Sequence, residues 1–306
     1  MFKNIKSIYI LDVIFKKFLR GKIYLRIIKH NKKLQKRLNI SLDDYKTFKK
    51  IEIVLIPITE LDEQEEKYNF INITNIKERK YCHIYFNNDK KTEIERTYLT
   101  KKDKVKEIKI VIDEEINSLS ELFNNCSCLQ SIHFIKFNRY NITNMNKMFR
   151  ECDELLNLNI SEMNTDNVKN MAFMFNGCNK LKILDVSNFR TSNVNNMRFM
   201  FSGCSSLQEL NLTNFDTKNV INMSNMFSAC HKLIKLNISN FYTSNVKHMN
   251  EMFFGCYSLK NLDISHLTII PQCSIKNMFA FCSDELWQQI MEQNKNLEFK
   301  PFEEFY

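Results

Sequence analysis

The hydrophobic pattern of the second half of this chain repeats every 26 residues. Each unit carries a Phe, a Cys three positions later, and in nearly every unit a Leu three positions after the Cys. Self-similarity at such a period is typical of proteins in which each unit buries its apolar face against its neighbours. We therefore expect the Phe and Cys columns to be structural ladders in one shared core. The Phe column contains Phe123, Phe149, Phe175, Phe201, Phe227, Phe253 and Phe279, and the Cys column contains Cys126, Cys152, Cys178, Cys204, Cys230, Cys256 and Cys282.

Within one unit the period of the apolar residues changes. In residues 222–230 they are spaced by three, one and three positions, which places them on one side of a short helix. In residues 236–238 they alternate with a polar residue, as in a strand with one face inward. Each unit is thus predicted as helix, loop, strand and return, and the predicted fold class is an α/β solenoid of seven stacked units.

The segments on either side of the repeat have patterns of their own. Residues 51–112 contain three strand-like runs, IEIVLIPI, YCHIYF and KEIKIVID, and the last of these is predicted to start the stack, because Ile108 lies 26 residues before Phe134. After Cys282, Ser283 followed by acidic residues predicts the start of a helix. The predicted domains are a basic helical module (1–50), a β-rich N-terminal cap (51–112), the solenoid (113–282) and a C-terminal capping helix and tail (283–306).

Composition and charge narrow the class of protein. With 44% hydrophobic residues the chain is expected to fold. The net charge of +9 is concentrated at the N-terminus, where residues 1–50 hold 15 Lys and Arg against three Asp. No run approaches the roughly 18 apolar residues that span a bilayer, and no small-residue cleavage site follows the first apolar run. We therefore expect a cytoplasmic protein with no membrane span.

The cysteine column allows three readings. Neighbouring units approach disulfide distance, but seven equivalent thiols do not pair completely. Zinc requires four convergent ligands in clustered spacing, whereas these residues form a line. The third reading, buried free thiols that act as small apolar side chains, is the one we expect. The Asn column at Asn167, Asn193, Asn219 and Asn245 is expected to bond to turn backbone rather than to a ligand.

No motif for catalysis is found in the sequence. A phosphate-binding loop needs several glycines close together, and the four glycines stand far apart. No H-E-x-x-H occurs, and the histidines show no metal-ligand spacing. The sequence therefore predicts a protein that is not an enzyme and has no cofactor and no metal site.

The repeat resembles a known family. Residues 219–239 read NVINMSNMFSACHKLIKLNIS and match the 26-residue surface-protein repeat of BspA-like leucine-rich-repeat proteins, a resemblance that covers residues 116–282. It implies a leucine-rich-repeat-like solenoid that binds other molecules. Bacterial relatives act at cell surfaces, so a surface adhesin of the BspA type is one functional alternative.

A second resemblance lies in the basic N-terminal module. The stretch YILDVIFKKFL is similar to the first helix of the F-box, and Leu11, Ile14, Phe15 and Leu19 carry the match. It implies that this module recruits a ubiquitin-ligase adaptor of the Skp type while the repeat selects a substrate. Two other readings remain open: the helices pack as a cap with a solvated basic face, or they bind nucleic acid or an anionic membrane. Nucleic acid is not among the partners that we expect.

The first functional hypothesis is a non-enzymatic scaffold that binds a protein partner on the strand face. Repeat proteins gain specificity by varying exposed side chains over a constant core. The Asn and Asp members of this face could equally well serve only to bond the backbone at strand edges. The predicted partner-binding residues are Asp185, Gln208, Glu209, Asn211, Lys235, Asn237 and Asp263.

Overall fold

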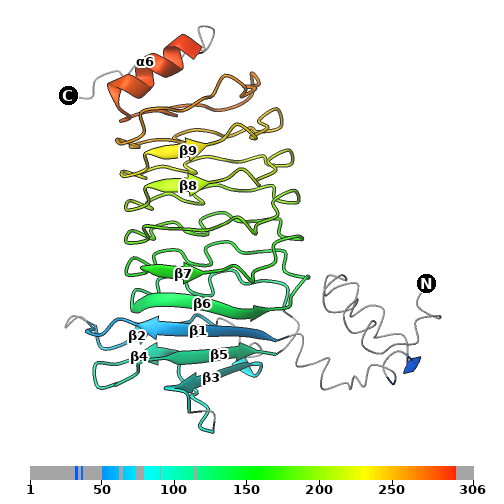
Figure 1. Cartoon of the computed structure of the whole chain (residues 1–306), viewed down its shortest axis with the longest axis vertical. Helices are drawn as coiled ribbons and strands as arrows, with labels where there is room; N and C mark the ends of the chain where they lie inside the picture. Colours follow the sequence, from blue (N-terminus) through cyan, green and yellow to red (C-terminus); the bar gives the residue numbers. More distant parts are fainter. Residues whose placement is uncertain are drawn as a thin grey trace.

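The computed structural model describes residues 32–33, 36, 50–61, 65–73, 79–89, 91–113 and 116–293. Strands and turns dominate these ranges, and one complete helix, α6, is present within them (Figure 1). The strands are β1 (Ile51–Pro57), β2 (Tyr68–Asn69), β3 (Cys82–Phe86), β4 (Tyr98–Leu99), β5 (Ile108–Ile112), β6 (Leu129–Phe137), β7 (Asn157–Asn159), β8 (Glu209–Asn211) and β9 (Lys235–Asn237), and the helix is α6 (Asp284–Gln293).

The largest sheet has five strands in the order β3-β5-β1-β6-β7. β1 alternates buried and half-buried residues and pairs antiparallel with β5 on one side and β6 on the other. The three strand-like runs of residues 51–112 thus form β1, β3 and β5. The prediction that the run containing Ile108 starts the stack is wrong, because β1 lies between β5 and the first repeat strand β6.

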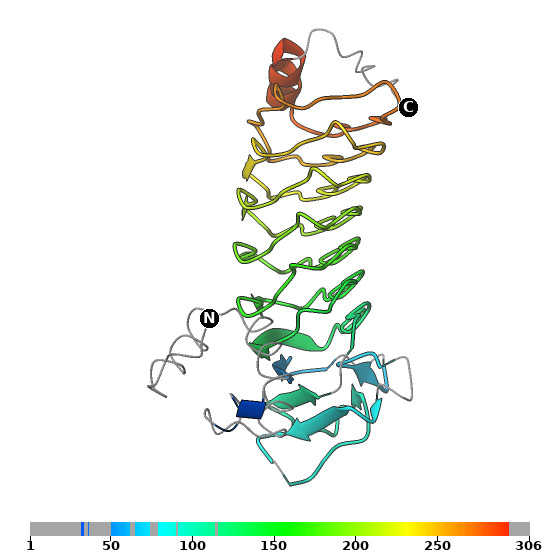
Figure 2. The same cartoon turned by 90° about the vertical axis from the view of Figure 1, so that its right-hand side faces the viewer.

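Beyond β6 the units follow one another in parallel register. β6 pairs with β7, and β8 pairs with β9 as a separate two-stranded sheet. In both pairs each residue lies opposite the residue 26 positions later in the chain. A second row of parallel bridges links residues 118, 144, 170, 196, 222, 248 and 274. Figure 2 shows the units edge-on, as loops placed one above the next between β6 and α6.

The residues before each Cys do not form the predicted helix. In the unit that ends at Cys230, Asn225 and Ala229 have φ of 57° and 58°, which interrupts helical hydrogen bonding. The N–H groups of residues 223, 225, 227 and 229 instead donate to carbonyls of the next unit. We call the eight residues before each Cys the turn leg.

The predicted fold class is therefore wrong. The structure is mainly β, with small mixed sheets rather than one continuous closed coil, and it is not an α/β solenoid with helical caps. The physical reason is that left-handed residues recur in every turn leg, so the backbone bonds between units rather than along a helix.

The core follows the apolar columns. The Phe rings one unit apart stack with centroids 5.3–5.7 Å apart and planes within 9° of parallel. All seven Phe side chains are buried, as are Met residues on the same leg, such as Met200 and Met226. This row of rings gives the repeat region a continuous apolar centre.

Helix α6 packs on the last unit. The hydroxyl of Ser283 accepts a hydrogen bond from the N–H of Leu286 at 3.2 Å, which caps the helix N-terminus. Leu286 and Ile290 are buried. On the same helix, the side-chain amide oxygens of Gln289 and Gln293 accept hydrogen bonds from the N–H groups of residues 262 and 264. Side-chain amides thereby bond the backbone edge that a further unit would otherwise occupy.

Two predictions concern residues that the structure does not describe. The helical module at 1–50 lies almost wholly outside the described residues, and so does the tail from 294 to 306. In the described part of the chain, no helix has the length and apolar character to cross a membrane.

Candidate binding surface

The polar columns inside the repeat bond the backbone of neighbouring units. Asn193, Asn219 and Asn245 each donate through Nδ2 to a carbonyl of the preceding unit at 2.7–2.8 Å. The buried Thr217 donates to the carbonyl of Tyr242 and accepts from its N–H. These amides and hydroxyls hold adjacent units in register, because each forms at least one hydrogen bond to the backbone of a neighbouring unit.

The cysteine column makes a regular set of contacts. In six consecutive units the thiol donates to the carbonyl of the Phe 29 residues earlier, at 3.0–3.2 Å. Eight of the ten cysteines are buried, and Cys273 and Cys282 are half-buried. Burial raises the pKa of Cys204 to about 12. Within the described residues no group of three His, Cys, Asp or Glu side chains could hold a metal ion.

The predicted Asn and Asp residues of the strand face form local turns. Asp185, Asn211, Asn237 and Asp263 are exposed, and each accepts a hydrogen bond from the N–H two residues on, at 2.9–3.1 Å. Hydrogen bonds from Ser187, through its side chain and then its backbone, lower the pKa of Asp185. One oxygen of each side chain is therefore committed to the turn, which is the local backbone role that the sequence left open.

The other predicted binding residues project from β8, β9 and the position before β8. Glu209 and Lys235 form an ion pair of 2.6 Å between the two strands. Their side chains are 65% and 73% exposed, so the pair contributes little to stability and its charges remain accessible. Gln208 is exposed beside them, and its carbonyl accepts the N–H of Ile234.

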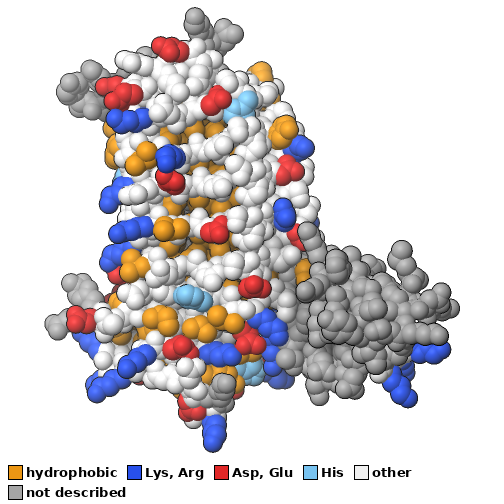
Figure 3. Space-filling model, in the orientation of Figure 1, with side chains coloured by type: hydrophobic (Ala, Val, Ile, Leu, Met, Phe, Trp, Pro, Cys, Tyr) orange, Lys and Arg blue, Asp and Glu red, His pale blue; other side chains and the backbone are white. Residues whose placement is uncertain are grey.

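Exposed aliphatic side chains stand on the same face beside the predicted binding residues. Ile183 is 81% exposed, Ile234 is 52% exposed, and Leu156 is 41% exposed. They stand four or five residues after a Cys, the positions that also hold Gln208, Glu209 and Lys235. Figure 3 shows apolar side chains interspersed with charged ones across the face between β6 and α6. A large aliphatic residue in an otherwise polar, variable column was the available sequence signal.

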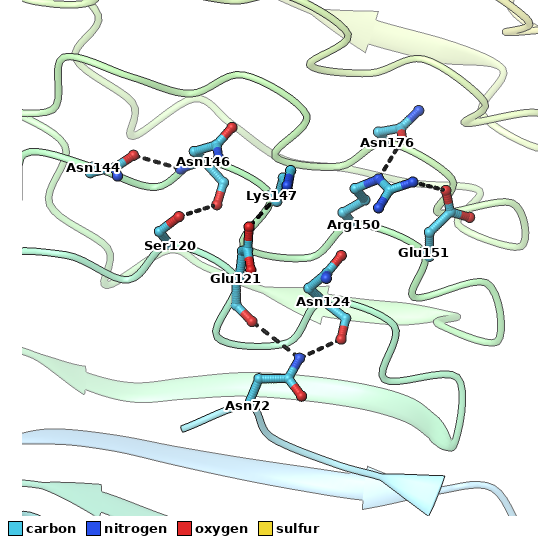
Figure 4. Close-up of polar contacts among 10 residues, drawn as sticks. All are labelled: Asn72, Ser120, Glu121, Asn124, Asn144, Asn146, Lys147, Arg150, Glu151 and Asn176. Atoms are coloured by element: carbon cyan, nitrogen blue, oxygen red, sulfur yellow. Dashed lines mark hydrogen bonds and ion pairs between the residues drawn. The ribbon is translucent and has the colours of Figure 1, made fainter. Parts of the chain in front are cut away.

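The opposite side of each unit is formed by the turn legs. In the first units it carries paired charges: Lys147 bonds Glu121 at 2.9 Å, and Arg150 bonds Glu151 at 3.2 Å (Figure 4). Asn72 donates to backbone carbonyls of the first unit and so ties the preceding loop to it (Figure 4). These contacts bind neighbouring segments to one another.

In the next two units the column of Glu121 and Lys147 holds Phe173 and Phe199. We call these two residues together with Arg198 the aromatic ledge. Both Phe residues are half-buried and have φ of 59° and 56°. The left-handed conformation costs about 1–2 kcal/mol for a residue with a side chain. The rings stack at 4.8 Å, and the Arg198 guanidinium lies 4.9 Å from the centroid of Phe199 and 5.7 Å from that of Phe173. A stacked aromatic pair stabilises the folded state by about 0.5–1.5 kcal/mol, which offsets part of this cost.

The predicted adaptor-binding residues Leu11, Ile14, Phe15 and Leu19 lie outside the described residues. Of the predicted site residues, only those of the strand face lie in the described part of the chain, and among them Glu209 and Lys235 are in direct contact.

Comparison with known proteins gave one family. A model described as a Mycoplasma protein of unknown function, DUF285, matches residues 117–230 and 202–296, which together exceed half of the chain. This family is related to the BspA-like repeat proteins. No curated protein matched the chain, and no solved structure matched it.

Proposed function

The chain belongs to the DUF285 family of Mycoplasma proteins of unknown function, and we propose that it is a non-enzymatic scaffold that binds a protein partner on its strand face. The surface is defined by Leu156, Ile183, Ile234 and the Glu209–Lys235 pair. One observation carries the proposal: large aliphatic side chains stand exposed beside accessible charges, on a face whose backbone is positioned by the buried residues of the repeat.

Apolar anchors beside charged groups are the composition from which protein interfaces gain affinity and orientation. The inward columns repeat from unit to unit, whereas the pair of residues four and five positions after the Cys is different in each unit. A partner with a complementary sequence of side chains would therefore contact several units at once.

The test is affinity capture with the native chain and with an Ile183→Asp, Ile234→Asp variant. A specific partner should be retained by the native chain, and its affinity, measured by calorimetry on the purified pair, should fall at least about tenfold in the variant, because a charge replaces each apolar anchor. The matched control is Ile221→Asp, since Ile221 is 45% exposed but does not belong to the strand face. Equal loss in the control, or equal binding by all three proteins, would reject the strand face.

We also propose that the protein works in the cytosol, because ten unpaired cysteines suit a reducing compartment. In protein isolated without reductant and then denatured, all ten thiols are expected to react with Ellman's reagent. In the native protein at pH 8, Cys273 should react first, because it is half-buried, whereas burial raises the pKa of Cys282 to about 12 and the other thiols are buried. Fewer than ten reactive thiols after denaturation would indicate disulfides and favour export.

A surface adhesin is the second candidate, supported by the relation of the family to BspA-like repeat proteins. Its binding face would be the same, so the thiol titration rather than the capture experiment separates the two candidates.

A further inference from the structure

We propose that the aromatic ledge is a docking site for the segment 294–306 of the same molecule. The ledge lies on the turn legs, apart from the strand face, so this inference does not depend on the proposed function.

The aromatic ledge combines partly exposed aromatic rings with a cation that has no carboxylate partner among the described residues. Phe173 and Phe199 remain partly exposed although their backbone is in a conformation that disfavours bulky side chains. Among the residues that the structure describes, no carboxylate forms an ion pair with Arg198, and its guanidinium contacts only the two rings. A planar cation over an aromatic pair is suited to binding a carboxylate next to an apolar group.

The fold does not require aromatic residues at these positions. The equivalent left-handed position of the other units holds Glu121, Lys147, Asn225, Glu251 or Asn277. Asn tolerates this conformation well. Residues in sparsely populated backbone conformations cluster at ligand-binding and switch sites.

The segment 294–306 is chemically complementary to the aromatic ledge. Residues 294–306 read NKNLEFKPFEEFY, with four aromatic residues and three glutamates, and the last six contain no basic residue. Thirteen residues span at most about 45 Å when extended. The ledge lies three units from the one that α6 covers, roughly 15 Å along the axis at the spacing of paired strands. The segment is thus long enough to reach the ledge of its own molecule.

Photo-crosslinking in the full-length protein tests the proposal. With Phe305 replaced by p-benzoylphenylalanine, irradiation should yield crosslinks to residues 170–202, mapped by mass spectrometry. Crosslinks within monomers would support the proposal, whereas crosslinked dimers whose yield rises with concentration would overturn it in favour of a second copy.

Two substitutions examine the contacts. Arg198→Glu should reduce the crosslink yield at this site about tenfold, and Glu303→Arg with Glu304→Arg should restore it in the Arg198→Glu background, because the charges are exchanged. Phe199→Asn should reduce the yield similarly while shifting the melting temperature by less than about 3 °C, since Asn occupies this position in other units.

Ile234→Asn on the strand face serves as the control and should leave the crosslink unchanged. Crosslinks that map elsewhere, or a yield indifferent to Arg198→Glu, would overturn the proposal. A large fall in the melting temperature of Phe199→Asn would show instead that the ring pair serves stability.

Discussion

Replacing Phe201 by alanine is expected to lower the free energy of unfolding by about 3–5 kcal/mol. Its ring is fully buried and stacks between Phe175 at 5.6 Å and Phe227 at 5.7 Å, so truncation leaves a cavity in the middle of the ladder. The rings on either side are held by their own units and cannot close the gap. Urea denaturation followed by circular dichroism measures the effect.

The matched control is Phe199→Ala, which removes the same atoms two residues away. Phe199 is half-buried and its left-handed backbone suits alanine slightly better, so the expected change is within about 1 kcal/mol. Equal costs for the two substitutions would contradict the assignment of Phe201 to the core and of Phe199 to the surface.

Replacing Ile53 by alanine is expected to cost about 2–5 kcal/mol and to weaken the repeat together with the N-terminal strands. Ile53 is fully buried in β1, opposite Ile110 of β5 and Phe134 of β6. Because β1 bonds both strands, its loosening should reduce hydrogen-exchange protection in β5 and β6 alike. Native-state hydrogen exchange resolved by mass spectrometry measures this.

Val54→Ala is the control for Ile53→Ala, since Val54 is the next residue of β1 and is only half-buried. Its expected cost is within about 1 kcal/mol. If Ile53→Ala lowered protection in β5 but left β6 unchanged, the N-terminal strands and the repeat would be independent folding units, contrary to this expectation.

The fixed period was sufficient to locate the residues of the core. Phe201, Cys204 and their equivalents recur in a sequence that otherwise varies, and burial is the simplest reason for such constancy. The start of α6 was also readable, because Ser283 and the acidic residues after it have a purely local role at a helix N-terminus.

The conformation of the turn leg was misread because its apolar spacing fits both a helix and a turn. Met223, Met226 and Cys230 face inward in either case. A signal was present: Gly177, Gly203 and Gly255, three of the four glycines, stand immediately before a Cys and have φ of 70–76°. Glycine recurring at one position indicates left-handed backbone there rather than helix.

The place of β1 between β5 and β6 could not be read from the repeat. Pairing across long sequence separations depends on which edges remain open after each element folds, and the 26-residue spacing between Ile108 and Phe134 suggested adjacency where there is none. The exposed Ile183 and Ile234 were visible in the sequence, but their accessibility depends on the strand face being uncovered.

The two glutamine side chains of α6 have a consequence for how such a chain changes in length. They accept hydrogen bonds from the N–H groups of residues 262 and 264, which would otherwise pair with a further strand, and so act as a terminator of this strand edge. Gene duplication could therefore add or delete a whole 26-residue unit ahead of residue 283 while the same terminator continued to close the end.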